Sequence, residues 1–259
     1  MGLINRVKTA FPFLLVVVVA VMLSGLNVHG TSMPAAEIVP ATANHQHEAL
    51  SASAMAEVAG KVLILFTHPE SSDKLWAGTA RGGLWQSIDG GISWSLSSEL
   101  MRDLTVSSIA LDPGNPDIMY AGTGDGRSNE AALRGKGMFR SDDGGKNWTL
   151  LQLTRPATVG ESWSHINSIA ISKAGVVLAA TSDHKRNGFI FRSVDAGLTW
   201  GFFPVYAGSK TGPKNMIHKV RFDPANPNTA IFMDDYANVT HSTDGGVSWN
   251  VVKKSSTCK

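Results

Sequence analysis

An aspartate followed by a glycine and a tryptophan recurs four times along the chain and is the first candidate for chemistry. The four octets are SIDGGISW at 87–94, SDDGGKNW at 141–148, SVDAGLTW at 193–200 and STDGGVSW at 242–249. A carboxylate can act as a general acid or base, or bind a metal ion. A catalytic group is needed once, however, whereas a feature present four times is typical of a repeating structural unit.

The residue types of the octet suit a tight turn. The fifth residue of each octet, the glycine at 91, 145, 197 and 246, can adopt a positive φ. The serine and aspartate side chains can hydrogen-bond turn amides that otherwise lack partners, and the tryptophan can bury its ring against a neighbouring strand or blade. We therefore interpret the octets as structural turns, with Asp89, Trp94, Asp143, Trp148, Asp195, Trp200, Asp244 and Trp249 as their key residues. No metal ion and no cofactor is expected.

The segments around each octet define the repeat. The four aspartates lie 54, 52 and 49 residues apart, which is typical of one supersecondary unit per repeat. Three short runs of strand character precede each octet, and a fourth follows each tryptophan. The sequence thus predicts an all-β fold, a β-propeller of four-stranded antiparallel blades. The expected blades cover about 62–97, 106–152, 166–205 and 217–253, within a propeller domain at 61–259.

The octets resemble the Asp-box (BNR) repeat of sialidases, xyloglucan-cleaving endoglucanases, sortilin-type receptor ectodomains and photosystem II assembly propellers. The resemblance covers residues 62–253 and implies the fold, but not an activity, because one fold hosts many functions. Propellers of this group usually have more than four blades. The chain is therefore expected to form a small closed ring, an open array or a shortened version of a longer relative. An open array would expose apolar sheet and favour self-association.

The N-terminus predicts export. Two basic residues precede an apolar run at 11–23, and small residues follow before Thr31. We expect a signal peptide at 1–30, an alanine-rich low-complexity spacer at 31–60, and a secreted or periplasmic, extracytoplasmic protein. An uncleaved signal would instead act as a membrane anchor. Lys and Arg total 23 against 21 Asp and Glu, which provides no strong field to attract nucleic acid.

In propellers that resemble this chain, ligands usually meet the face opposite the Asp-box turns. That face is built by the loops between the second and third strands and by the connections between blades, and the loop at 124–137 is the longest of these loops. The candidate ligand-binding residues are Asp125, Arg127, Glu130, Arg134, Trp163, His165, His184 and Arg186, and Lys214 and His218 belong to the same face. An aromatic side chain beside arginines and carboxylates suits a sugar or an anionic group.

The sequence assigns no catalytic residue, so whether the protein is an enzyme stays open. A sialidase-like mechanism would need an arginine triad, and the F-R-I-P stretch that accompanies the first arginine in that family is absent. A xyloglucanase-like mechanism needs two carboxylates across a cleft, and nothing pairs candidates such as Asp183, Asp234 and Asp235. We expect a secreted recognition module for glycans or proteins. The alternatives are a glycoside hydrolase or its inactive remnant, and an assembly factor of the photosystem type.

Overall fold

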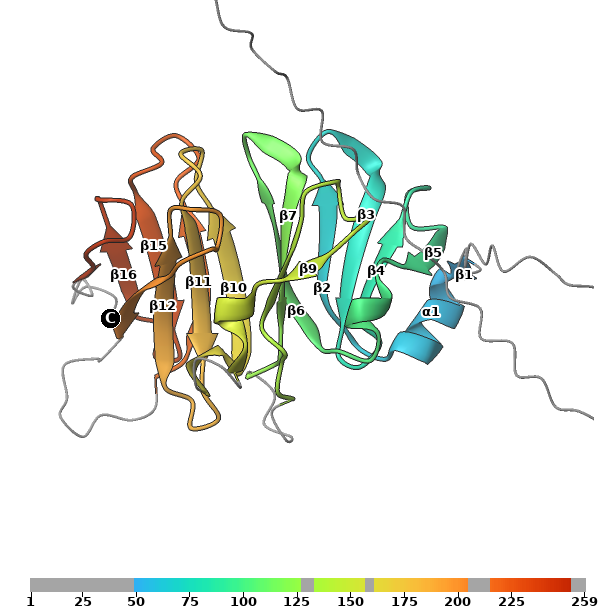
Figure 1. Cartoon of the computed structure of the whole chain (residues 1–259), viewed down its shortest axis with the longest axis horizontal. Helices are drawn as coiled ribbons and strands as arrows, with labels where there is room; N and C mark the ends of the chain where they lie inside the picture. The colour runs from blue at the N-terminus through green and yellow to red at the C-terminus, as the bar shows by residue number, and fades with distance from the viewer. Residues whose placement is uncertain (1–48, 127–132, 157–160, 205–214, 253–259) are drawn as a thin grey trace, which may run out of the picture. The chain divides into compact units, whose positions relative to one another are not determined.

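The computed structural model describes residues 49–126, 133–156, 161–204 and 215–252, all within the second of two units of the chain, His45–Lys259. The described part consists of four antiparallel sheets, each formed mainly by strands that follow one another in the sequence (Figure 1). The prediction of four-stranded antiparallel blades is thus confirmed. Among the described residues, no helix has the length and apolar character needed to cross a bilayer.

The blades are numbered in chain order. Blade 1 contains β2 (Val62–His68), β3 (Ser71–Thr79), β4 (Leu84–Ser87) and β5 (Ser93–Leu96); blade 2 contains β6 (Val106–Asp112), β7 (Asn115–Thr123), β8 (Met138–Ser141) and β9 (Thr149–Leu150). Blade 3 contains β10 (His165–Ile171), β11 (Val177–Ser182), β12 (Gly188–Ser193) and β13 (Gly201–Pro204); blade 4 contains β14 (Ile217–Phe222), β15 (Ala230–Asp234), β16 (Val239–Ser242) and β17 (Asn250–Val251). Short 3-10 helices lie in the connections at Glu99–Met101, Gln152–Thr154 and Glu161–Trp163.

Two elements before blade 1 differ from the expected spacer. β1 (Leu50–Ser51) pairs antiparallel with β5, and α1 (Ala52–Ala59) lies beside these strands (Figure 1). Residues 50–59, which the sequence assigns to the spacer, thus form a short strand and a helix. Alanine is the strongest helix former, and the helix places the buried Met55 and Ala59 one turn apart on the same face. The predicted signal peptide and the spacer up to residue 48 lie outside the described residues.

The tryptophan of each Asp box packs toward the element that precedes its blade. Trp148 joins the apolar cluster between blades 1 and 2, Trp200 the cluster between blades 2 and 3, and Trp249 the cluster between blades 3 and 4. Trp94 of blade 1 has no preceding blade among the described residues and packs with Met55 and Ala59 of α1 instead. The helix thus takes the place of a preceding blade.

The second strand of each of the first three blades carries a small residue that lets the next blade approach closely. A Cβ atom added at Gly78 in β3 would lie 2.5 Å from the carbonyl oxygen of Val106, and one at Gly122 in β7 would lie 2.5 Å from Ile166 Cγ2. The equivalent residue of β11, Ala180, is fully buried. Close approach of successive blades therefore depends on a small residue at this register position.

The two ends of the blade array differ. α1 covers apolar residues of blade 1, whereas the far side of blade 4 exposes Ile231 to 46%, Met233 to 43% and Val239 to 38%. In a closed four-bladed ring this side of blade 4 would pack on the Trp94 side of blade 1, which α1 occupies. The described residues therefore favour an open array over a closed ring.

Candidate functional site

The Asp-box turns share one hydrogen-bond pattern. In the second box, the Ser141 hydroxyl donates to Asp143 Oδ1 at 2.8 Å and accepts from the Gly145 amide at 2.9 Å. Asp143 Oδ1 also accepts from the Asn147 amide at 2.9 Å, and Trp148 Nε1 donates to the Gly145 carbonyl at 2.9 Å. The same bonds form in the other three boxes. The box carboxylates thus bind their own turns.

These hydrogen bonds stabilise the charged form of the box carboxyls. The Ser93 hydroxyl, followed by the Ser93 amide, lowers the pKa of Asp89 from 3.8 to about 2. Thr199 makes the same two bonds and lowers the pKa of Asp195 to about 2. The pKa of each of the other two box aspartates is lowered as well. A carboxyl with such a low pKa is a poor proton donor near neutral pH, so the boxes do not suit general acid catalysis.

Asp143→Ala should lower the free energy of unfolding by about 1–3 kcal/mol, because turn amides and the Ser141 hydroxyl lose their acceptor. The bonds to the Asn147 amide hold the pKa of Asp143 below its ordinary value. Asp143 therefore stabilises the fold fully above about pH 4, and this stabilisation is lost as the pH falls through its folded-state pKa. The difference from the wild type, measured by denaturant unfolding, should accordingly shrink in acid.

Asp142→Ala is the control for this prediction. The Asp142 side chain is 63% exposed and pairs with Arg140, and an exposed ion pair contributes about 0–1 kcal/mol. An Asp143→Ala protein as stable as the Asp142→Ala protein would contradict the structural role of the box.

The rim opposite the Asp boxes gathers charged side chains of blades 3 and 4. Asp235 Oδ1 lies 2.6 Å from His218 Nε2, and Asp235 Oδ2 lies 3.3 Å from Arg186 Nη2. The Met216 amide also donates to Asp235 Oδ2, at 3.2 Å. The side chains of His218 and Arg186 are 35% and 38% exposed, so this cluster can present hydrogen-bond donors to a ligand.

The long loop of blade 2 approaches the start of β10. Asp125 is 8% exposed, and its backbone pairs with Leu133 at the base of the loop. His165 is 1% exposed, and burial lowers the pKa of its imidazole, whereas the charge of Asp125 has a smaller effect in the opposite direction. His165 is therefore a neutral, enclosed side chain near pH 7 and does not present itself at the surface.

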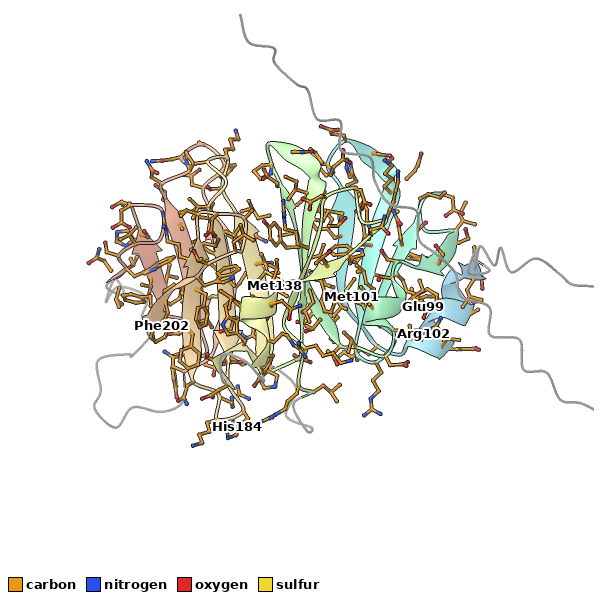
Figure 2. All side chains as sticks on the ribbon, viewed as in Figure 1. Glu99, Met101, Arg102, Met138, His184 and Phe202 are labelled. Atoms are coloured by element: carbon orange, nitrogen blue, oxygen red, sulfur yellow. The ribbon has the colours of Figure 1, made fainter. Side chains whose placement is uncertain are left out.

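The structure separates the predicted ligand-binding residues into distinct environments. Arg134 and His184 are exposed, and His184 projects from the lower edge of the blades in Figure 2. Trp163 does not offer a stacking surface, because it is 1% exposed and its ring stacks on Phe191 at 4.3 Å. Arg127 and Glu130 lie outside the described residues.

The first strands of the four blades together line one cavity of about 700 Å³. β2 contributes Leu63–Phe66, β6 Ser107–Leu111, β10 Asn167–Ile171 and β14 His218–Phe222. The charged side chains among its lining residues are Lys173, Lys219, Arg221 and Asp223, so cations outnumber anions. The cavity therefore favours an anionic ligand group.

Comparison with known proteins identifies the repeat. The family model of the BNR/Asp-box repeat matches residues 139–150, which contain the second box and parts of its flanking strands. The chain carries BNR/Asp-box repeats. No curated protein matches the chain in sequence.

Solved GH74 enzymes share the propeller fold of this Asp-box chain. The GH74 enzyme of Niastella koreensis is 21% identical with a TM-score of 0.53, over 72% of this chain and 28% of that chain. The GH74 xyloglucanase of Xanthomonas campestris is 16% identical with a TM-score of 0.53, over 73% of this chain and 29% of that one. An ancestral GH74 enzyme is 19% identical with a TM-score of 0.56, over 75% of this chain and 26% of that one. The Asp-box chain thus spans less than a third of the length of these enzymes.

Proposed function

We propose that this Asp-box propeller is an exported recognition module that binds a glycan or protein ligand at the rim opposite the Asp boxes. The observation that supports the proposal is the contrast between the two rims. The box carboxylates are occupied by hydrogen bonds within their own turns. The opposite rim brings Arg186, His218 and Asp235 into one cluster, in which the side chains of Arg186 and His218 are each more than a third exposed. Export is proposed from the signal peptide expected at 1–30.

Binding fits the described carboxylates of this rim better than glycoside hydrolysis does. A glycosidase needs two carboxyl groups roughly 5–10 Å apart, one of them with a raised pKa. Burial alone would raise the pKa of Asp234, but hydrogen bonds from Asn215 and Asn238 outweigh burial and lower it. Asp235 is held between His218 and Arg186. Asp234 is therefore a poor proton donor, and Asp235 suits the positioning of Arg186 and His218.

The proposal is tested by measuring the binding of xyloglucan oligosaccharides, sialylated glycans and acidic peptides to the purified protein. The double change Arg134→Ala and Arg186→Ala should weaken binding of the recognised probe about 10-fold or more, because two donors to the ligand are lost. The matched control, Lys74→Ala with Lys146→Ala, removes the same charge from exposed positions on the Asp-box rim. It should leave binding and the melting temperature unchanged.

Two outcomes would contradict the proposal. The first is that none of these probes binds, or that binding depends only on the control positions Lys74 and Lys146. In that case this rim would not be the recognition site. Release of sugar that is abolished by Asp125→Asn or Asp235→Asn would instead make the protein a glycoside hydrolase.

A further inference from the structure

The side of blade 4 that faces away from blade 3 combines cationic and apolar side chains. Val220 and Phe232 are buried against blade 3, and residues alternate between the two faces of a strand. The cross-strand pairs place the opposite face in two rows, Lys219–Met233–Val239 and Arg221–Ile231–His241. We call these six residues the blade 4 outer face.

The blade 4 outer face is not built to receive another blade. Met233 occupies the register position of Gly78, Gly122 and Ala180, whose small size allows the next blade to approach. Lys219 and Arg221 occupy the positions of Ser168 and Ala170 in blade 3. A fifth blade at the same spacing would collide with Met233 and bury two cationic side chains, which is unfavourable without matched anions.

The blade 4 outer face continues into the central cavity. Lys219 and Arg221 belong to the outer face and also line the cavity. Leu63 and Leu65 of β2 line the same cavity, and Leu65 is 60% exposed. The aromatic residues among the described lining are Phe66 and Phe222, both of which also pack partly against the apolar clusters between blades. Cations beside apolar side chains suit a ligand that combines carboxylates with apolar groups.

We infer that the cavity and the blade 4 outer face together form a docking surface for an acidic segment of a partner protein that also carries apolar side chains. The inference rests on the proposed function and narrows its ligand from glycans or proteins to a protein. Carboxylates of the segment pair with Lys219 and Arg221, and its apolar side chains cover Ile231 and Met233. A second copy of this chain fits less well, because two such faces would bring like charges together.

The test uses a synthetic peptide of alternating Glu and Leu, its Lys–Leu counterpart, polygalacturonate and phosphatidylglycerol vesicles. The Glu–Leu peptide should bind, and added salt should weaken the binding. Lys219→Glu with Arg221→Glu should weaken it at least about 10-fold. The control Lys74→Glu with Lys146→Glu makes the same charge change on the Asp-box rim and should alter binding less than about 2-fold. Should the first double variant fail to fold, Ile231→Ser with Met233→Ser tests the apolar half of the surface and should weaken binding as well.

If the two charge-reversal variants lost affinity for the Glu–Leu peptide equally, binding would depend only on the net charge of the protein, and the inference would be overturned. Binding of polygalacturonate or the vesicles without binding of the Glu–Leu peptide would overturn it too. These outcomes can be distinguished from a failure of the proposed recognition function. A glycan that binds through Arg134 and Arg186 while the Glu–Leu peptide does not would end this inference and leave the recognition role in place.

Discussion

Replacement of Trp163 by alanine is expected to lower the free energy of unfolding by about 3–5 kcal/mol. The Trp163 ring is 1% exposed, stacks on Phe191 at 4.3 Å and meets Trp200 edge-on at 5.0 Å. It belongs to the apolar cluster between blades 2 and 3. Loss of the indole would leave a cavity at this interface, because neighbouring blades can relax only partly. Denaturant unfolding monitored by circular dichroism measures the effect.

Tyr236→Ala is the control, because Tyr236 is an aromatic residue that is 46% exposed. Its replacement should change the free energy of unfolding by less than about 1 kcal/mol. If Trp163→Ala abolished ligand binding at unchanged stability, the stacking role predicted from the sequence would be correct and the core assignment would be wrong.

Met55→Asp should lower the free energy of unfolding by at least about 3 kcal/mol. Met55 is 4% exposed and packs in one cluster with Trp85 and Trp94 of blade 1. A carboxylate at this position would have to be buried without a partner or to expose the cluster to water. Detachment of α1 would uncover both tryptophans, and their fluorescence emission should shift to longer wavelength.

Val58→Asp introduces the same carboxylate into the same helix at a residue that is 69% exposed. It should cost less than about 1 kcal/mol and leave the fluorescence spectrum unchanged. Similar, small effects of the two substitutions would show that α1 does not cover blade 1 in solution.

The periodic part of the fold could be predicted from the sequence because its signals are local. Each box forms a turn through contacts within eight residues, and short apolar runs lie at similar distances on either side. α1 escaped this reasoning because eight residues give little periodicity, and an alanine-rich composition is shared by helices and by spacers. The helix is stabilised by packing on Trp85 and Trp94, and these side chains form one apolar surface only after blade 1 has folded.

The candidate site was predicted less completely because it depends on contacts between distant segments. The sequence places Arg186 and His218 on one face and offers Asp235 as a candidate carboxylate, but it gives no reason to join them. The Arg186–Asp235 pair forms only when blades 3 and 4 pack together. For Trp163, the sequence suggested an exposed side chain that the structure shows to be buried. Its position in a connection between blades suggests exposure, whereas Phe191 and Trp200 enclose it. Local residue types predict which rim to examine, but not which side chains are accessible there.

Hydrogen exchange of the protein, measured with and without the probe that binds it, tests most directly whether ligands meet the rim opposite the Asp boxes. The predicted result is slower amide exchange at 183–187, 217–222 and 235–238, with no change in the Asp-box turns at 87–94, 141–148, 193–200 and 242–249. Slower exchange confined to the Asp-box turns would contradict the account, because the ligand would then meet the rim assigned here to structure alone.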